Sequence, residues 1–80
     1  MDTIFLDDFL VDGLIKEKEF RAKIKAINWE EYNNKKVMIK GCTSVPVPTW
    51  AYLIITAHLA KHSDKILYGE PCSAVEIYKK

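Results

Sequence analysis

Two cysteines are the most reactive side chains of this 80-residue chain, and each follows a stretch whose residues predict a strand. Cys42 and Cys72 are therefore candidates for a nucleophile, a redox pair or metal ligands. Glu70, between Gly69 and Pro71, is the carboxylate next to Cys72 in the sequence. Cys42, Cys72 and Glu70 form the candidate site, and the sequence identifies no catalytic residue, metal or cofactor.

The sequence leaves three roles open for the cysteines. Both can be buried, inert thiols. Cys42 can be a nucleophilic or redox thiol, because a helix N-terminus follows and its amides lower a thiol pKa. However, the prolines of the intervening loop remove amide donors, and the loop lacks the glycines or arginine of an anion-binding loop. Finally, Cys42 and Cys72 can share a metal or a reversible disulfide; a structural zinc takes four ligands, which a two-fold dimer supplies.

Two histidines lie four residues apart on a predicted helix, a spacing that suits a metal. His58 and His62 are near the C-terminal end of that helix, whereas Cys42 precedes its N-terminal end. Two to three helical turns separate them, beyond the reach of one metal ion. We interpret both as surface histidines near the negative end of the helix dipole.

The elements that position the cysteines form a βαβ unit. Residues 37–40 and 65–68 predict strands, and residues 49–62 predict a helix with Thr49 as its N-cap. Two such strands are parallel with a right-handed crossover, so both cysteines would follow strand ends at one edge of the sheet. The continuous apolar run at 37–39 predicts a strand that is covered on both faces.

The flanking segments complete a small α/β domain. Residues 16–27 predict a helix with Phe20, Ile24 and Ile27 on one face, and Trp29 begins a connector that pins its end. Short strands are expected at residues 3–6 and 73–78, the latter at the sheet edge. The expected fold is one domain, 1–80, with a short, mainly parallel sheet and two main helices, about 16–27 and 49–62.

The helix at 49–62 is apolar over more than half of its circumference. A helix of this kind is buried on two sides. Because the chain is short, we expect its second side to pack against another subunit, which predicts a homodimer.

Composition limits the classes of partner. The chain has 12 basic and 11 acidic residues and a net charge of +1, which predicts no nucleic-acid partner. Its acidic start lacks the features of a signal peptide, and its longest uncharged run is interrupted by prolines and polar residues, so no membrane span is expected. These features predict a cytoplasmic protein, in which cysteines are free thiols, ligands or redox groups rather than structural disulfides.

Five parts of the sequence stand out as signature stretches: Gly13-Leu14-Ile15 with Glu19-Phe20-Arg21, Asn28-Trp29 with Tyr32, Ile39-Lys40-Gly41-Cys42, Val47-Pro48-Thr49-Trp50-Ala51-Tyr52, and Tyr68-Gly69-Glu70-Pro71-Cys72-Ser73. Together they resemble an uncharacterised bacterial family, domain of unknown function 2480. The resemblance implies a small cytosolic α/β protein without an established activity. It also implies members about twice as long, with two related halves, of which this chain resembles a single unit.

Two functions follow as hypotheses. The first is a homodimeric binding or interaction module with structural cysteines and an unknown small-molecule ligand, if any. The alternative is a thiol- or metal-dependent protein that uses Cys42 and Cys72 for redox chemistry, sulfur transfer or metal binding, with Glu70 nearby.

Overall fold

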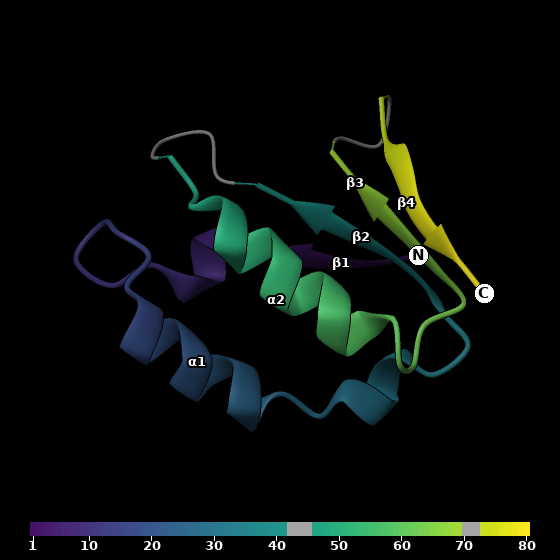
Figure 1. The fold of residues 1–80 in the computed structure, drawn as a ribbon, viewed down its shortest axis with the longest axis horizontal. Coiled ribbons are helices and arrows are strands. Elements are labelled where there is room, and N and C mark those ends of the chain that lie inside the picture. The colour runs from purple at the N-terminus through teal and green to yellow at the C-terminus, as the bar shows by residue number, and fades with distance from the viewer. Residues whose placement is uncertain (42–45, 70–72) are drawn as a thin grey trace.

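A computed structural model of the chain describes residues 1–41, 46–69 and 73–80 and contains a four-stranded sheet (Figure 1). The strands are β1 (Asp2–Phe5), β2 (Lys36–Lys40), β3 (Lys65–Tyr68) and β4 (Val75–Lys79); the helices are α1 (Glu17–Ala26) and α2 (Thr49–Leu59), and two short 3-10 helices are η1 (Leu6–Phe9) and η2 (Trp29–Tyr32). The predicted small α/β fold, with its two main helices, is confirmed.

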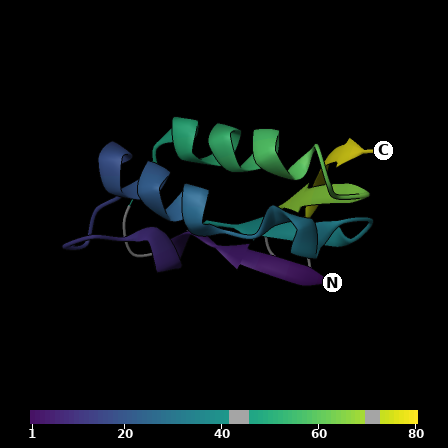
Figure 2. The same ribbon diagram turned by 90° about the horizontal axis from the view of Figure 1, so that it is seen from below.

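The strands lie in the order β1-β2-β3-β4. β1 and β2 are parallel, as are β2 and β3, whereas β4 is antiparallel to β3 at the edge. The mainly parallel sheet, the βαβ unit and the C-terminal edge strand agree with prediction. Because consecutive right-handed crossovers in one direction place their helices on one side, α1 and α2 both cover the same face (Figure 2).

α1 is amphipathic and ends as the connector begins. Phe20 and Ile24 are buried against the core, while the exposed side carries an ion pair of 3.0 Å between Arg21 and Glu17. The indole of Trp29 donates a hydrogen bond of 3.2 Å to the carbonyl of Ile24. This bond provides a partner for a carbonyl in the last turn of α1 and attaches the connector to the helix end, as predicted.

α2 begins at Thr49, but Thr49 is not its N-cap. Pro48 holds the cap position, with φ −59° and ψ 140°, and no side chain caps the helix. The proline ring fixes φ and prepares the chain for the first helical residue, so the prediction of a Thr49 cap was wrong. The helix ends at Leu59, and His62 belongs to the following turn.

The core lies between the helices and one face of the sheet. Ala51, Ile55 and Leu59, which follow a spacing of four residues along α2, are fully buried. Phe20 of α1 packs edge-on against Trp50 of α2, with ring centroids 5.5 Å apart. α2 is therefore buried on two sides, as predicted, but its second side packs against α1 of the same chain.

The opposite face of the sheet has no helix over it among the residues described. Met38, in the middle of β2, points to this face yet is only 1% exposed. Val37 and Ile39, on the helix side, are also almost fully buried, so the predicted burial of this strand on both faces is confirmed. None of the described helices has the length and apolar character needed to cross a membrane.

Candidate functional site

The predicted site residues Cys42, Glu70 and Cys72 lie outside the described residues. The ends of the strands that precede them are described and are adjacent. The amide of Gly69, just after β3, donates a hydrogen bond of 3.1 Å to the carbonyl of Ile39 in β2. Both cysteines thus follow neighbouring strand ends, as the βαβ unit predicts.

Both histidines have partners within the chain. His58 stacks on Trp29, and the Nδ1 of His62 lies 2.7 Å from the amide oxygen of Asn33. Each ring is only partly buried, so both histidines lie at the surface. Over the ranges 1–41, 46–69 and 73–80, no group of three or more His, Cys, Asp or Glu side chains is arranged to hold a metal ion.

An apolar groove of about 250 Å³ lies between α2 and the last two strands. Its lining is Ile39, Tyr52, Leu53, Thr56, Tyr68 and Ile77. Leu53 on α2 is 64% exposed and Ile77 on β4 is 49% exposed, so the groove is open to solvent. We call it the α2–β4 groove.

The shape of the groove follows from local structure. The pairing of β3 with β4 shifts register between Ile66 and Leu67, which forms a bulge in β4 at Ile77. The bulge directs the side chain of Ile77 toward the helix side. At the other end, the rings of Tyr52 and Tyr68 meet edge to face, with centroids 5.0 Å apart. A side chain at Gly41 would collide with the Tyr52 hydroxyl, so glycine lets β2 end beneath this tyrosine pair.

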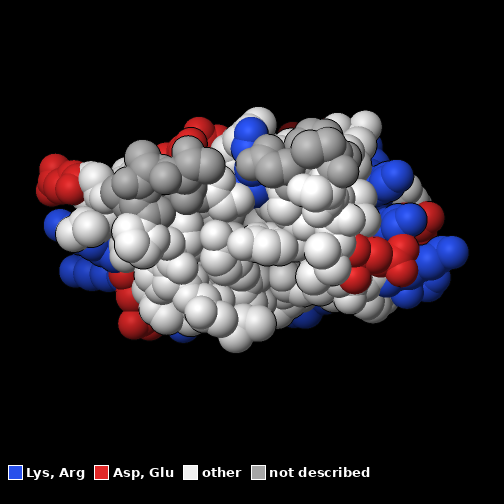
Figure 3. All heavy atoms as spheres, turned by 90° about the horizontal axis from the view of Figure 1, so that it is seen from above, with Lys and Arg blue, Asp and Glu red and all other residues white. Residues whose placement is uncertain are grey.

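None of the residues that line the groove is charged. Figure 3 shows a broad area without Lys, Arg, Asp or Glu between two charged ends of the molecule. Val75, at the start of β4, adds another side chain that is 57% exposed. Contiguous exposed apolar surface of this kind marks an interaction site more often than a catalytic one.

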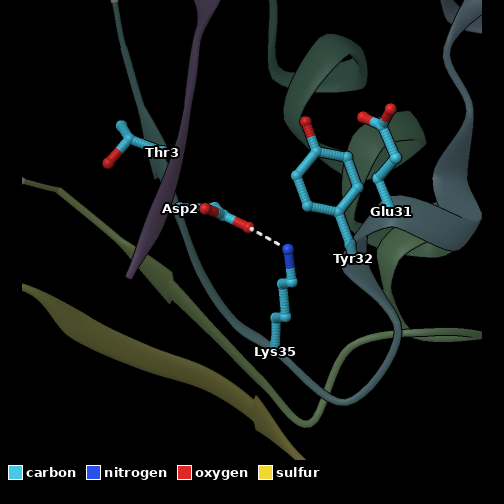
Figure 4. Close-up of a pocket in the computed structure, with 5 residues that line it drawn as sticks. All are labelled: Asp2, Thr3, Glu31, Tyr32 and Lys35. Carbon is cyan, nitrogen blue, oxygen red and sulfur yellow. Dashed lines mark ion pairs between the residues drawn. The ribbon is translucent and has the colours of Figure 1, made fainter.

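A second hollow of about 500 Å³ is polar and opens at the start of β1. Asp2 and Lys35 form an ion pair of 3.5 Å across it, and the phenol of Tyr32 and the carboxylate of Glu31 lie on its far side (Figure 4). Burial raises the pKa of Tyr32, and the charges of Asp2 and Glu31 raise it further. The phenol is therefore a neutral hydrogen-bond donor at physiological pH.

Sequence reasoning missed both hollows. For the α2–β4 groove a signal existed, since Leu53 widens the apolar arc of α2 and Ile77 lies in an alternating strand. The bulge that brings these two residues together has no signature in the sequence. For the polar hollow the sequence contains no signal, because nothing in the sequence indicates that Asp2 and Lys35 form an ion pair.

Comparisons with known proteins place the chain in a family. The pattern described as "Protein of unknown function (DUF2480)" matches residues 1–62 and also residues 30–80. No curated protein and no solved structure matches the chain. The matches together span the whole chain, which therefore belongs to the DUF2480 family of proteins of unknown function.

Proposed function

We propose that the protein is a homodimeric interaction module in which the α2–β4 groove of one copy receives a second copy. The observation that carries this proposal is the exposure of Leu53 and Ile77 at one groove, at 64% and 49%. Such residues lose contact with water when a partner covers them, and burial of a leucine or isoleucine stabilises a complex by about 1.5–3 kcal/mol each.

The family comparison supports a second copy as the partner. Two matches of one family pattern overlap over residues 30–62, the segment that contains β2, all of α2 and all but the first residue of η2. One continuous alignment gives one match, so two overlapping matches indicate that this segment is similar to two parts of the pattern. The resemblance of the sequence implies family members with two such units, and a dimer of this chain also has two.

Charge and size support the same surface. A second copy placed in the α2–β4 groove meets no like charge there, since none of the residues that line the groove is charged. A stable interface takes about 800 Å² from each partner. The chain exposes 5080 Å² in total, so the dimer requires roughly one sixth of its surface.

Sedimentation velocity over a range of protein concentrations tests the proposal. The wild-type chain is expected to sediment with twice the 9.2 kDa of one chain. Leu53→Glu is expected to yield single chains, because it would bury an unpaired carboxylate in the interface. Circular dichroism checks that the variant retains its helices.

Leu14→Glu is the matched control. Leu14 is also an exposed leucine, at 57%, but lies in the turn between η1 and α1, far along the chain from the groove. It should leave the dimer intact. A wild-type mass of one chain at the highest soluble concentration contradicts the proposal, and equal dissociation by Leu14→Glu contradicts the choice of surface.

A thiol- or metal-dependent function is a second candidate. It is favoured by the hydrogen bond between Gly69 and Ile39, because this bond joins the strand ends that lead to Cys72 and Cys42. Thiol titration and elemental analysis of protein purified without a histidine tag test it. Bound metal, or two thiols that react faster than free cysteine, supports this function; metal-free protein with unreactive thiols rules it out.

A further inference from the structure

The face of the sheet turned away from the helices is rich in lysine. Side chains alternate along a strand, and the core takes Ile4, Val37, Ile39 and Ile66 from the helix side (Figure 2). The alternate strand residues therefore point to the helix-free face. They are Thr3 and Phe5 of β1, Lys36, Met38 and Lys40 of β2, Lys65 and Leu67 of β3, and Glu76 and Lys79 of β4.

Three of these lysines form one row across the sheet. Lys36 is opposite Lys65 in the pairing of β2 with β3, and Lys65 is opposite Lys79 in the pairing of β3 with β4. Like charges directly opposite each other destabilise a sheet. Glu76 compensates one of them, since its carboxylate lies 3.1 Å from the ammonium of Lys65. The row keeps a net positive charge that an anionic ligand would neutralise.

An accessible aromatic ring lies toward the opposite end of the same face. Phe5 is 43% exposed, and the ammonium of Lys40 is 5.7 Å from the centre of its ring. Lys40 follows Lys36 by four residues along β2, a distance of about 13 Å in a strand. The face thus carries the lysine row at one end and, toward the other end, an aromatic ring that is partly open to solvent.

We propose that the helix-free face of the sheet binds single-stranded nucleic acid. Lysines that follow the phosphates and an aromatic ring that stacks on a base are the two features that such binding requires. A second copy of the chain does not fit, because it would bring two rows of lysines together. The net charge of +1 predicts no nucleic-acid partner, but strand pairing collects on one face lysines that are scattered in the sequence.

Fluorescence anisotropy with a labelled oligothymidylate of about 15 nucleotides, longer than the binding site of one small sheet domain, tests the proposal. Between about 50 and 200 mM salt, contacts from the three lysines of the row give a slope of log affinity against log salt of about −2. Replacing Lys36 and Lys79 together by alanine should reduce the magnitude of this slope by about 1.4. Phe5→Ala should weaken binding at least about fivefold and leave the slope unchanged, since the ring contributes stacking and no charge.

The double variant Lys18→Ala and Lys25→Ala is the matched control, because it removes the same charge from exposed positions of α1 on the other side of the sheet. It should change neither affinity nor slope. Absence of binding, or equal loss in the control, overturns the proposal. A second experiment measures binding to vesicles that contain phosphatidylserine. Binding to these vesicles through Lys36 and Lys79, without binding to the oligonucleotide, also overturns the proposal. The groove variant Leu53→Glu should bind the oligonucleotide with the affinity of the wild type. The test of nucleic-acid binding is therefore independent of the test of dimer formation.

Discussion

The indole of Trp29 and the imidazole of His58 lie parallel, with centroids 5.0 Å apart and an angle of 9° between the rings. The contact joins the connector after α1 to the last turn of α2. It partly buries His58, and this burial lowers the pKa of the imidazole, which the nearby Lys61 and His62 lower further. Protonation of His58 therefore works against the folded state.

The sign of the pH dependence follows from this shift. The folded pKa of His58 is below the unfolded value of 6.5, so its contribution to stability is present above pH 6.5 and is lost as the pH falls through the folded pKa. Thermal unfolding should show a lower Tm at acid pH than at neutral pH. His58→Phe keeps an aromatic ring on Trp29 and should reduce this difference, and an unchanged difference would show that other groups cause it.

Gly41→Ala should destabilise the protein through Tyr52. A Cβ at position 41 would overlap the Tyr52 hydroxyl, while the next ring atom, Cζ, would be 3.5 Å away, an ordinary contact. Overpacking of this kind costs about 1–3 kcal/mol in free energy of unfolding. The comparison is a double-mutant cycle by urea denaturation with Tyr52→Phe, which removes the oxygen. Gly41→Ala should cost about 1 kcal/mol less in the Tyr52→Phe background, and additive effects would contradict the predicted collision.

The elements with strong local periodicity could be predicted from the sequence. The spacing of Phe20 and Ile24 predicts helix α1, and the apolar run around Met38 predicts strand β2. In so short a chain, these apolar residues can be buried only in the one core. Parallel pairing of β2 and β3 then follows from the helix between them.

Relationships between distant elements could not be predicted in the same way. The wide apolar arc of α2 correctly indicates burial on two sides, but only the fold shows that α1 supplies the second side through Phe20 and Trp50. The groove at Leu53 depends on a bulge in β4, and the lysine row depends on strand register. Both are set by pairing across the sheet, which local patterns do not specify. The predicted roles of Cys42, Glu70 and Cys72 stay predictions.

Ser63→Ala should leave stability unchanged or raise it. The side chain of Ser63 is fully buried in the turn after α2, and its hydroxyl has no hydrogen-bond partner within the described chain. A buried polar group without a partner costs about 1–3 kcal/mol, which alanine removes. Thr56→Val is the matched comparison, because the Thr56 hydroxyl donates a hydrogen bond of 2.7 Å to the carbonyl of Tyr52. Thermal unfolding should show a lower Tm for Thr56→Val only; a clear fall for Ser63→Ala would mean that its hydroxyl is bonded in solution.

Phe20→Ala should come close to unfolding the protein. Phe20 is fully buried, with its ring 5.2 Å from that of Phe9 and 5.5 Å from that of Trp50, so it joins η1, α1 and α2. Loss of a buried phenylalanine costs about 3–5 kcal/mol. A domain of this length has a free energy of unfolding of only about 4–12 kcal/mol. Urea denaturation at one fixed protein concentration measures the effect and keeps any dimer contribution constant. Leu14→Ala, at an exposed position, should cost little. Equal midpoints for the two variants would mean that the core is not organised around Phe20.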